Sequence, residues 1–196
     1  TVQSSAIYVA QMRDWLPDYI GGVLWFGNDD ANMVALTPIY SCLESVPDCY
    51  SAKHANATTF SFRNAYWVCN WVSNMVYYRY DLLFPELKTV RDRLEKDFNS
   101  VQDYMEAKAK EMGEADGKKF LSDYSLRMSG MMLDEWMQLA QKLIVKYNDM
   151  CVKKVDGNGD YILTPGGEPV APQRPGYPEH YLRKMVEESG DKYLIK

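Results

Sequence analysis

Residues 6–40 read AIYVAQMRDWLPDYIGGVLWFGNDDANMVALTPIY, and this stretch decides how the first part of the chain folds. Gly21 to Gly27 is a continuous apolar run bounded by glycines, which is typical of a strand buried on both faces. Residues 6–12 alternate loosely and predict a neighbouring strand. We expect a further strand to begin at residues 33–36 and residues 37–40 to close the unit.

A polar turn follows the apolar run directly and contains Asn28, Asp29, Asp30 and Asn32. Polar groups at the mouth of a buried strand are costly unless something satisfies or uses them. Two interpretations stay open. The carboxylates and amides bind a substrate, or they form an Asx-rich turn that satisfies its own backbone.

Aromatic and apolar residues recur at helical spacing in the stretch 64–80, which predicts a largely buried helix. A helix start at Phe84-Pro85-Glu86 opens an amphipathic helix over about residues 85–112. Gly113 and Gly117 are expected to break it, and a second helix follows over about residues 118–154. The short turn between them predicts an antiparallel helical hairpin.

The predicted fold class is therefore α+β, with three regions along the chain. We expect a strand-rich part at 1–63, a helical region with a long hairpin at 64–155, and an extended Pro/Gly segment with a short C-terminal helix at 156–196. A short strand is also expected near Thr58–Phe62. Residues 164–178 contain five prolines and three glycines, which favours an extended surface segment.

Four stretches form distinctive sequence motifs: QMRDWLPDYIGGVLWFGNDDANMVALTPIYSC (11–42), VPDCY (46–50), NAYWVCNWVSNMVYYRY (64–80) and RPGYPEHYLRKMVEESGDKYLI (174–195). Together they resemble the dipeptidase family of N-terminal-nucleophile cysteine hydrolases, of the dipeptidase A type. The resemblance covers most of the chain. The family's nucleophile is a cysteine at the start of the mature protein, and none of the four cysteines here is near residue 1. We therefore expect the C-terminal portion of such an enzyme.

The resemblance implies a four-layer αββα sandwich, dipeptide substrates, and no metal or cofactor. In such an enzyme the thiolate of the first residue is the nucleophile, the free α-amino group is the base, and backbone and amide donors hold the oxyanion. From residue type alone, a carboxylate of the polar turn would bind the substrate's α-ammonium, and an amide there would donate to the oxyanion. The isolated chain is expected to be inactive.

Other side chains are weaker candidates for substrate binding. Arg13, Arg63 and Arg79 would each pair with a substrate carboxylate, although such arginines more often make surface or interhelical ion pairs. Asn70 and Asn74 lie one turn apart on the predicted helix and would point into a pocket together. For these amides, capping or bridging of nearby backbone is an equally good interpretation.

Composition excludes several other classes of function. The net charge of −5 argues against nucleic-acid binding, which needs clustered Lys and Arg. No apolar run reaches the ~20 residues of a membrane span. Because the chain opens on Thr1 rather than methionine, the missing signal peptide leaves the compartment open, cytoplasmic or exported.

Metal and disulfide chemistry leave few candidates. The sequence has no CxxC motif and no histidine that would accompany the cysteines as a ligand, so no zinc site is predicted. His54 is expected to be solvated. Residues 156–160 look like the start of a calcium loop, but Tyr161 stands where glycine is required, so a surface turn is predicted. Cys42 and Cys49 flank a short turn, which makes a local disulfide geometrically possible.

Two alternatives to the dipeptidase hypothesis stay open. The chain would be a non-enzymatic α+β interaction or oligomerisation module, because its apolar stripes leave surface that a homo-oligomer would cover. Less favoured is Thr1 as the nucleophile of an N-terminal threonine hydrolase.

Overall fold

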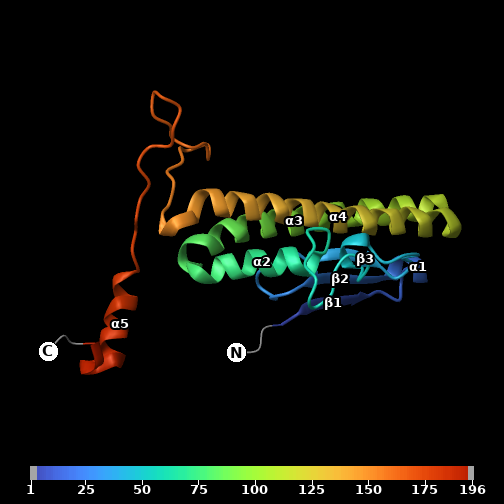
Figure 1. The fold of residues 1–196 in the computed structure, drawn as a ribbon. Helices are drawn as coiled ribbons and strands as arrows, with labels where there is room; N and C mark the ends of the chain where they lie inside the picture. Colours follow the sequence, from blue (N-terminus) through green and yellow to red (C-terminus); the bar gives the residue numbers. More distant parts are fainter. Residues whose placement is uncertain (1–3, 194–196) are drawn as a thin grey trace. The chain divides into compact units, whose positions relative to one another are not determined.

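The computed structural model describes residues 4–193 and shows an α+β fold (Figure 1). The described residues form two compact units that divide after Lys142. The first unit holds an antiparallel sheet of strand order β1-β2-β3 and the long helices that pack with it. Its strands are β1 (Ala6–Met12), β2 (Gly22–Asn28) and β3 (Thr37–Tyr40); its helices are α1 (Asp18–Gly21), η1 (Asp48–Tyr50), α2 (Ala65–Tyr78), α3 (Tyr80–Met112) and α4 (Glu114–Tyr147), the last of which runs on past the division.

The second unit contains η2 (Asn148–Met150), α5 (Glu179–Ser189) and η3 (Gly190–Tyr193), with an extended segment between η2 and α5. The predicted surface turn is confirmed. Asp156 Oδ1 accepts the backbone N–H groups of Asn158 and Asp160 at 2.8 and 3.0 Å, and a bridge joins Val155 to Tyr161.

The long helices cover one face of the sheet, and on the other face only the Phe26 ring is contacted, by Tyr50 of η1 at a centroid distance of 4.9 Å among the described ring contacts. Val23 and Trp25 of β2 are buried on the helix side, whereas Leu24 is 36% exposed and Phe26 is half-buried on the other. The sequence predicted that β2 is buried on both faces. Burial is confirmed for the face toward the helices, and the prediction is wrong for the outer face within this chain. Other parts of this chain therefore bury only one side of the continuous apolar run.

The third strand begins at Thr37, so the prediction of a strand at residues 33–36 is wrong. Met33, Val34 and Ala35 are nevertheless buried. The N–H of Leu36 donates to Glu95 Oε1 of α3 at 3.0 Å. This stretch therefore enters the core as a loop, with a helix carboxylate accepting a backbone donor that a strand would have paired.

The helix predicted over residues 64–80 is confirmed as α2, but its buried face differs from the expectation. The residues in the core are small or β-branched: Ala65, Val68, Cys69, Val72 and Val76. The aromatic residues expected there, Tyr66, Trp67, Trp71, Tyr78 and Tyr80, are half-buried or exposed. Small side chains let a helix approach its neighbours closely, while the amphipathic rings remain at the surface.

The short strand expected near residues 58–62 is absent, and a single bridge joins Asn56 to Thr59. Phe60 and Phe62 instead pack against Trp67 and Trp71 of α2, with ring centroids 5.8 and 5.6 Å apart. Ring contacts with the helix replace strand pairing in this loop.

The antiparallel hairpin of α3 and α4 is confirmed. Ion pairs of 2.6 Å between Arg93 and Glu135 and of 2.8 Å between Lys142 and Glu86 cross it. The helix bounds differ from those expected. Pro85 lies inside α3, which already begins at Tyr80, and α4 ends at Tyr147 instead of near 154.

The two glycines of the hairpin have different roles. Gly113 ends α3 with φ +80°, a left-handed conformation that favours glycine. Gly117 does not break the helix but lies inside α4. A Cβ there would lie 2.5 Å from the carbonyl oxygen of Ala109, so glycine permits the close approach of the two helices.

Toward its C-terminal end, the buried face of α3 is polar. Val101 and Met112, whose helical spacing from Leu94 and Phe98 predicts a place on the apolar face, are exposed, whereas Gln102 and Glu106 are buried. Glu106 accepts two hydrogen bonds from Arg13, at 2.7 and 2.8 Å. The ion pair joins the residue that follows β1 to α3. Glu106 is therefore a charged residue at a position where the helical periodicity predicts an apolar one.

We expect Arg13→Met to lower the free energy of unfolding by roughly 3–5 kcal/mol, because it leaves the Glu106 carboxylate buried without its ion partner. Urea unfolding measures this. The double variant Arg13→Met/Glu106→Leu should recover part of the loss, since apolar residues of similar volume can replace a buried pair. A single variant as stable as the wild type would contradict the burial of this carboxylate.

Candidate functional site

The polar turn after β2 is anchored to α2 through Asp29. This aspartate is 2% exposed and has φ +80°. Asn70 Nδ2 donates to its Oδ1 at 2.9 Å, and Ser73 Oγ donates to its Oδ2 at 2.6 Å. Both carboxylate oxygens therefore accept hydrogen bonds from one face of α2, and these bonds fix the position of the turn.

Sequence reasoning nominated Asp29, Asn70 and Asn74 but missed Ser73. Asn74 Nδ2 donates to the carbonyl oxygen and Oδ1 of Asn70, at 2.7 and 3.1 Å, so it orients Asn70 from behind. Ser73 lies three residues after Asn70, on the same face of the helix. Ser73 could have been recognised from the sequence, because it is a small polar residue on the otherwise apolar buried face of the helix.

The exposed side of the turn is held by tyrosines. Tyr77 donates from its hydroxyl to Asp30 Oδ2, and Asn32 Nδ2 donates to the hydroxyl oxygen of Tyr80 at 3.1 Å. Asp30 and Asn32 are thus brought together with α2 and the start of α3. The Asx-turn interpretation is also partly supported, because Asp30 Oδ1 accepts the backbone N–H of Asn32 at 3.5 Å.

Asn28 differs from the other polar residues of the turn. It is the last residue of β2 and is half-buried. Among the described residues 4–193, its side-chain amide makes no hydrogen bond. Because side chains alternate along a strand, Asn28 lies on the same face as Leu24, which is exposed, and Phe26, whose ring contacts that of Tyr50 in η1 with centroids 4.9 Å apart.

The four cysteines are free thiols, so the possible disulfide between Cys42 and Cys49 is not formed. Cys42 Sγ instead lies 3.7 Å from the carbonyl oxygen of Lys118, and Cys49 Sγ lies 3.5 Å from that of Ser129, both in α4. Burial raises the pKa of Cys42, raises that of Cys49 to about 12 and, with the charge of Asp29, raises that of Cys69. These three thiols lack the lowered pKa of an activated nucleophile.

The three arginine candidates are engaged in ion pairs. Arg13 binds Glu106, Arg63 binds Asp48 at 3.0 Å, and Arg79 binds Asp81 at 2.9 Å. His54 also departs from expectation, because its Nε2 lies 2.8 Å from Asp48 Oδ1. The hydrogen bonds from His54 first, and then from Arg63, lower the pKa of Asp48.

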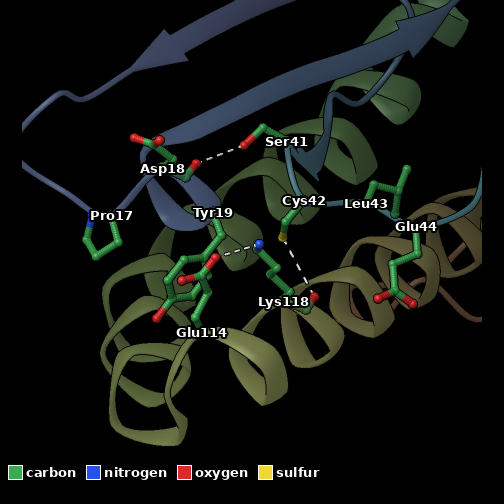
Figure 2. Close-up of a pocket in the computed structure, with 9 residues that line it drawn as sticks. All are labelled: Pro17, Asp18, Tyr19, Ser41, Cys42, Leu43, Glu44, Glu114 and Lys118. Atoms are coloured by element: carbon green, nitrogen blue, oxygen red, sulfur yellow. Dashed lines mark hydrogen bonds and ion pairs between the residues drawn. The ribbon is translucent and has the colours of Figure 1, made fainter.

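A pocket of about 560 Å³ lies at the other end of β2 from the turn (Figure 2). Its lining comes from α1, the loop after β3 and the first turns of α4: Pro17, Asp18, Tyr19, Ser41, Cys42, Leu43, Glu44, Glu114 and Lys118. Lys118 Nζ pairs with Glu114 Oε1 at 2.7 Å, and Ser41 Oγ donates to the carbonyl oxygen of Asp18 at 3.1 Å. These groups satisfy one another without placing a base beside a nucleophile, and sequence reasoning nominated none of them.

Within residues 4–193, no three His, Cys, Asp or Glu side chains gather in a way that would hold a metal ion. In the same residues, no helix combines the length and apolar character that crossing a membrane requires.

The sheet, the polar turn and the helix that holds it all lie in the first 93 residues, and this range matches a family of peptidases. It is peptidase family C69, the family of the dipeptidase A-type N-terminal-nucleophile cysteine hydrolases, and residues 1–93 match its model. The match ends within α3, before the rest of the hairpin and the C-terminal segment. No curated protein matched the chain.

We expect Asp29→Ala to lower the free energy of unfolding by about 2–3 kcal/mol, because the Asn70 and Ser73 donors lose their buried acceptor. Asp29→Asn should cost less, since asparagine tolerates positive φ and keeps one acceptor oxygen. Urea unfolding of the two variants measures the difference. Equal losses would contradict the anchoring role of the Asp29 backbone and carboxylate.

Proposed function

We propose that this chain supplies part of the active site of a cysteine dipeptidase whose N-terminal nucleophile lies outside these 196 residues. The observation that carries the proposal is the Asn28 amide. It is free of other described side chains, lies on the uncovered face of the sheet, and follows directly from a strand within the range that matches a peptidase family. The anchored turn beside it holds this amide in place.

The contacts divide the turn into two sets of roles. Asn28 Nδ2 donates to the oxyanion that forms when a thiolate attacks the substrate's carbonyl carbon. Asp30 has carboxylate capacity beyond its bonds from the Tyr77 hydroxyl and the Asn32 N–H, and it binds the α-ammonium of the dipeptide. Asp29 and Asn32 position the turn, because their own groups are already used by α2 and α3.

The chemistry itself needs a thiolate and a base. The thiolate bonds to the carbonyl carbon, the α-amino group passes the thiol's proton to the leaving amine, and water then hydrolyses the thioester. The described thiols of Cys42, Cys49 and Cys69 are unsuited to this step because their pKa values are raised. Because the family's nucleophile is the first residue of the mature protein and none of the four cysteines here lies near residue 1, the proposal assigns the nucleophile to a cysteine outside these 196 residues.

The uncovered sheet face supports the αββα sandwich as the complete fold. Leu24 presents apolar surface there, and a second sheet packs about 10 Å from the first in such an architecture. The second sheet would then bury the outer face of the apolar run Gly21 to Gly27, whose sequence predicts burial on both faces. The alternative nucleophile Thr1 lies outside the described residues.

The isolated chain is expected to show no dipeptide hydrolysis, whereas a longer natural protein that begins with cysteine after processing should be active. In that protein, Asn28→Ala should lower kcat/KM by about 10²–10³, the usual cost of one oxyanion donor. Dipeptide turnover with an unchanged melting temperature measures this.

Asn99→Ala is the matched control, because Asn99 is an exposed amide on α3 that donates to the Glu95 carbonyl oxygen. It should leave kcat/KM unchanged. Turnover that survives in the isolated chain, with contaminants excluded, would contradict the proposal and direct attention to Thr1→Ala.

A further inference from the structure

A second cavity, of about 310 Å³, lies between α4 and the chain segments of residues 48–49 and 62–63. Its lining residues all belong to the first compact unit: Asp48, Cys49, Phe62, Arg63, Leu126, Gly130, Leu133, Asp134 and Met137. We call this cavity the Gly130 groove. It shares no residue with the polar turn after β2 or with the pocket beside Cys42.

The floor of the groove is an apolar row on one face of α4, whose members follow one another at helical spacing: Leu126, Gly130, Leu133 and Met137. A Cβ at Gly130 would meet nothing within 4 Å, whereas a Cβ at Gly117 would collide with the facing helix. Glycine inside a helix is destabilising relative to alanine. Because packing does not require glycine at position 130, its effect there is to keep the floor of the groove open.

The walls of the groove carry opposite charges. Asp134 is exposed on α4, and among residues 4–193 its carboxylate makes no hydrogen bond or ion pair. Arg63 Nη2 donates to Asp48 Oδ2 at 3.0 Å, and the other N–H groups of this guanidinium make no hydrogen bond in the described part of the chain. The Arg63 side chain is 67% exposed, so these donors are accessible.

Asp48 is not available as a second anionic site. Its Oδ1 lies 2.8 Å from His54 Nε2, and its Oδ2 accepts from Arg63. The groove therefore combines one unpaired carboxylate, one guanidinium with unused donors, and an apolar floor.

We propose that the Gly130 groove binds a free α-amino acid with an apolar side chain. The ammonium group of the ligand pairs with Asp134, its carboxylate accepts from Arg63, and its side chain lies over Gly130 against Leu133 and Phe62. A zwitterion is the ligand whose charges complement a wall of each sign.

The size of the groove favours a single amino acid over a longer peptide. Ligand pockets span about 300–1,000 Å³, and this groove lies at the lower end of that range. Since the groove is separate from Asn28 and the polar turn, binding here does not rest on the proposed function.

The floor is tested by filling it. L-leucine titrated into the isotope-labelled chain should give saturable NMR shifts, largest around Gly130 of α4, with a Kd of about 1 mM. Gly130→Leu should weaken this binding at least about tenfold, because the new side chain occupies the floor. The same variant should melt at a higher temperature, since leucine is a strong helix former, so lost binding is not lost folding.

Ligand analogues test the two charged walls. Leucinamide lacks the carboxylate and N-acetyl-leucine lacks the ammonium group, and each should bind roughly 3–10-fold more weakly than L-leucine. In Arg63→Gln, L-leucine and leucinamide should bind equally, and in Asp134→Asn, L-leucine and N-acetyl-leucine should bind equally. Asp123→Asn is the matched control, because Asp123 is an exposed aspartate of α4 outside the groove, and it should keep the wild-type preferences.

Four results would overturn the proposal. The first is an absence of saturable L-leucine binding, and the second is unchanged affinity in Gly130→Leu. The third is glycine or leucyl-leucine binding at least as tightly as L-leucine, which would remove the apolar side chain or the single amino acid from the proposal. The fourth is loss of L-leucine binding in Asn28→Ala, which would place the ligand at the polar turn; this variant should otherwise bind like the wild type.

Discussion

The buried ion pair between Arg13 and Glu106 is the interaction that most of the first unit depends on. Glu106 is buried, and its Oε1 also accepts from the Tyr40 hydroxyl at 2.8 Å and from Gln102 Nε2 at 2.9 Å. Arg13 Nη2 further donates to the Ile20 oxygen at 3.0 Å. One carboxylate therefore ties the end of β1, the end of β3 and α3 together, and a buried carboxylate needs these partners because desolvation is costly.

This network sets which face of the sheet is closed. Gln102 Nε2 also donates to Gln11 Oε1, which accepts from Trp25 Nε1 at 3.1 Å. The polar contacts therefore hold α3 against the side of the sheet that carries Trp25 and Tyr40. Burial, and then the bond to Glu106, raise the pKa of Tyr40, which keeps its phenol neutral and donating. The opposite face carries Asn28 and the exposed Leu24.

Much of the site was predictable from residue type and position. Four polar side chains directly after a buried strand marked the turn, and helical spacing marked Asn70 and Asn74. Ser73 was missed, because serine is common in helices and its role depends on how near Asp29 lies, 44 residues away. The arginines were ambiguous in sequence for the same reason: their carboxylate partners lie on other elements or, for Arg79, on the adjoining helix start.

The sequence by itself determined the α+β class, the strands near residues 6–12 and 21–27, the helical hairpin and the family resemblance, because local periodicity and long motifs can be recognised along one chain. Only the tertiary structure decided that Met33 to Leu36 run as a buried loop, that Glu106 replaces an apolar stripe residue, and that β2 is covered on one face. Those outcomes depend on contacts between distant residues. A hydrogen bond or ion pair in the core can override the period of a stretch once the partner's position in space is set.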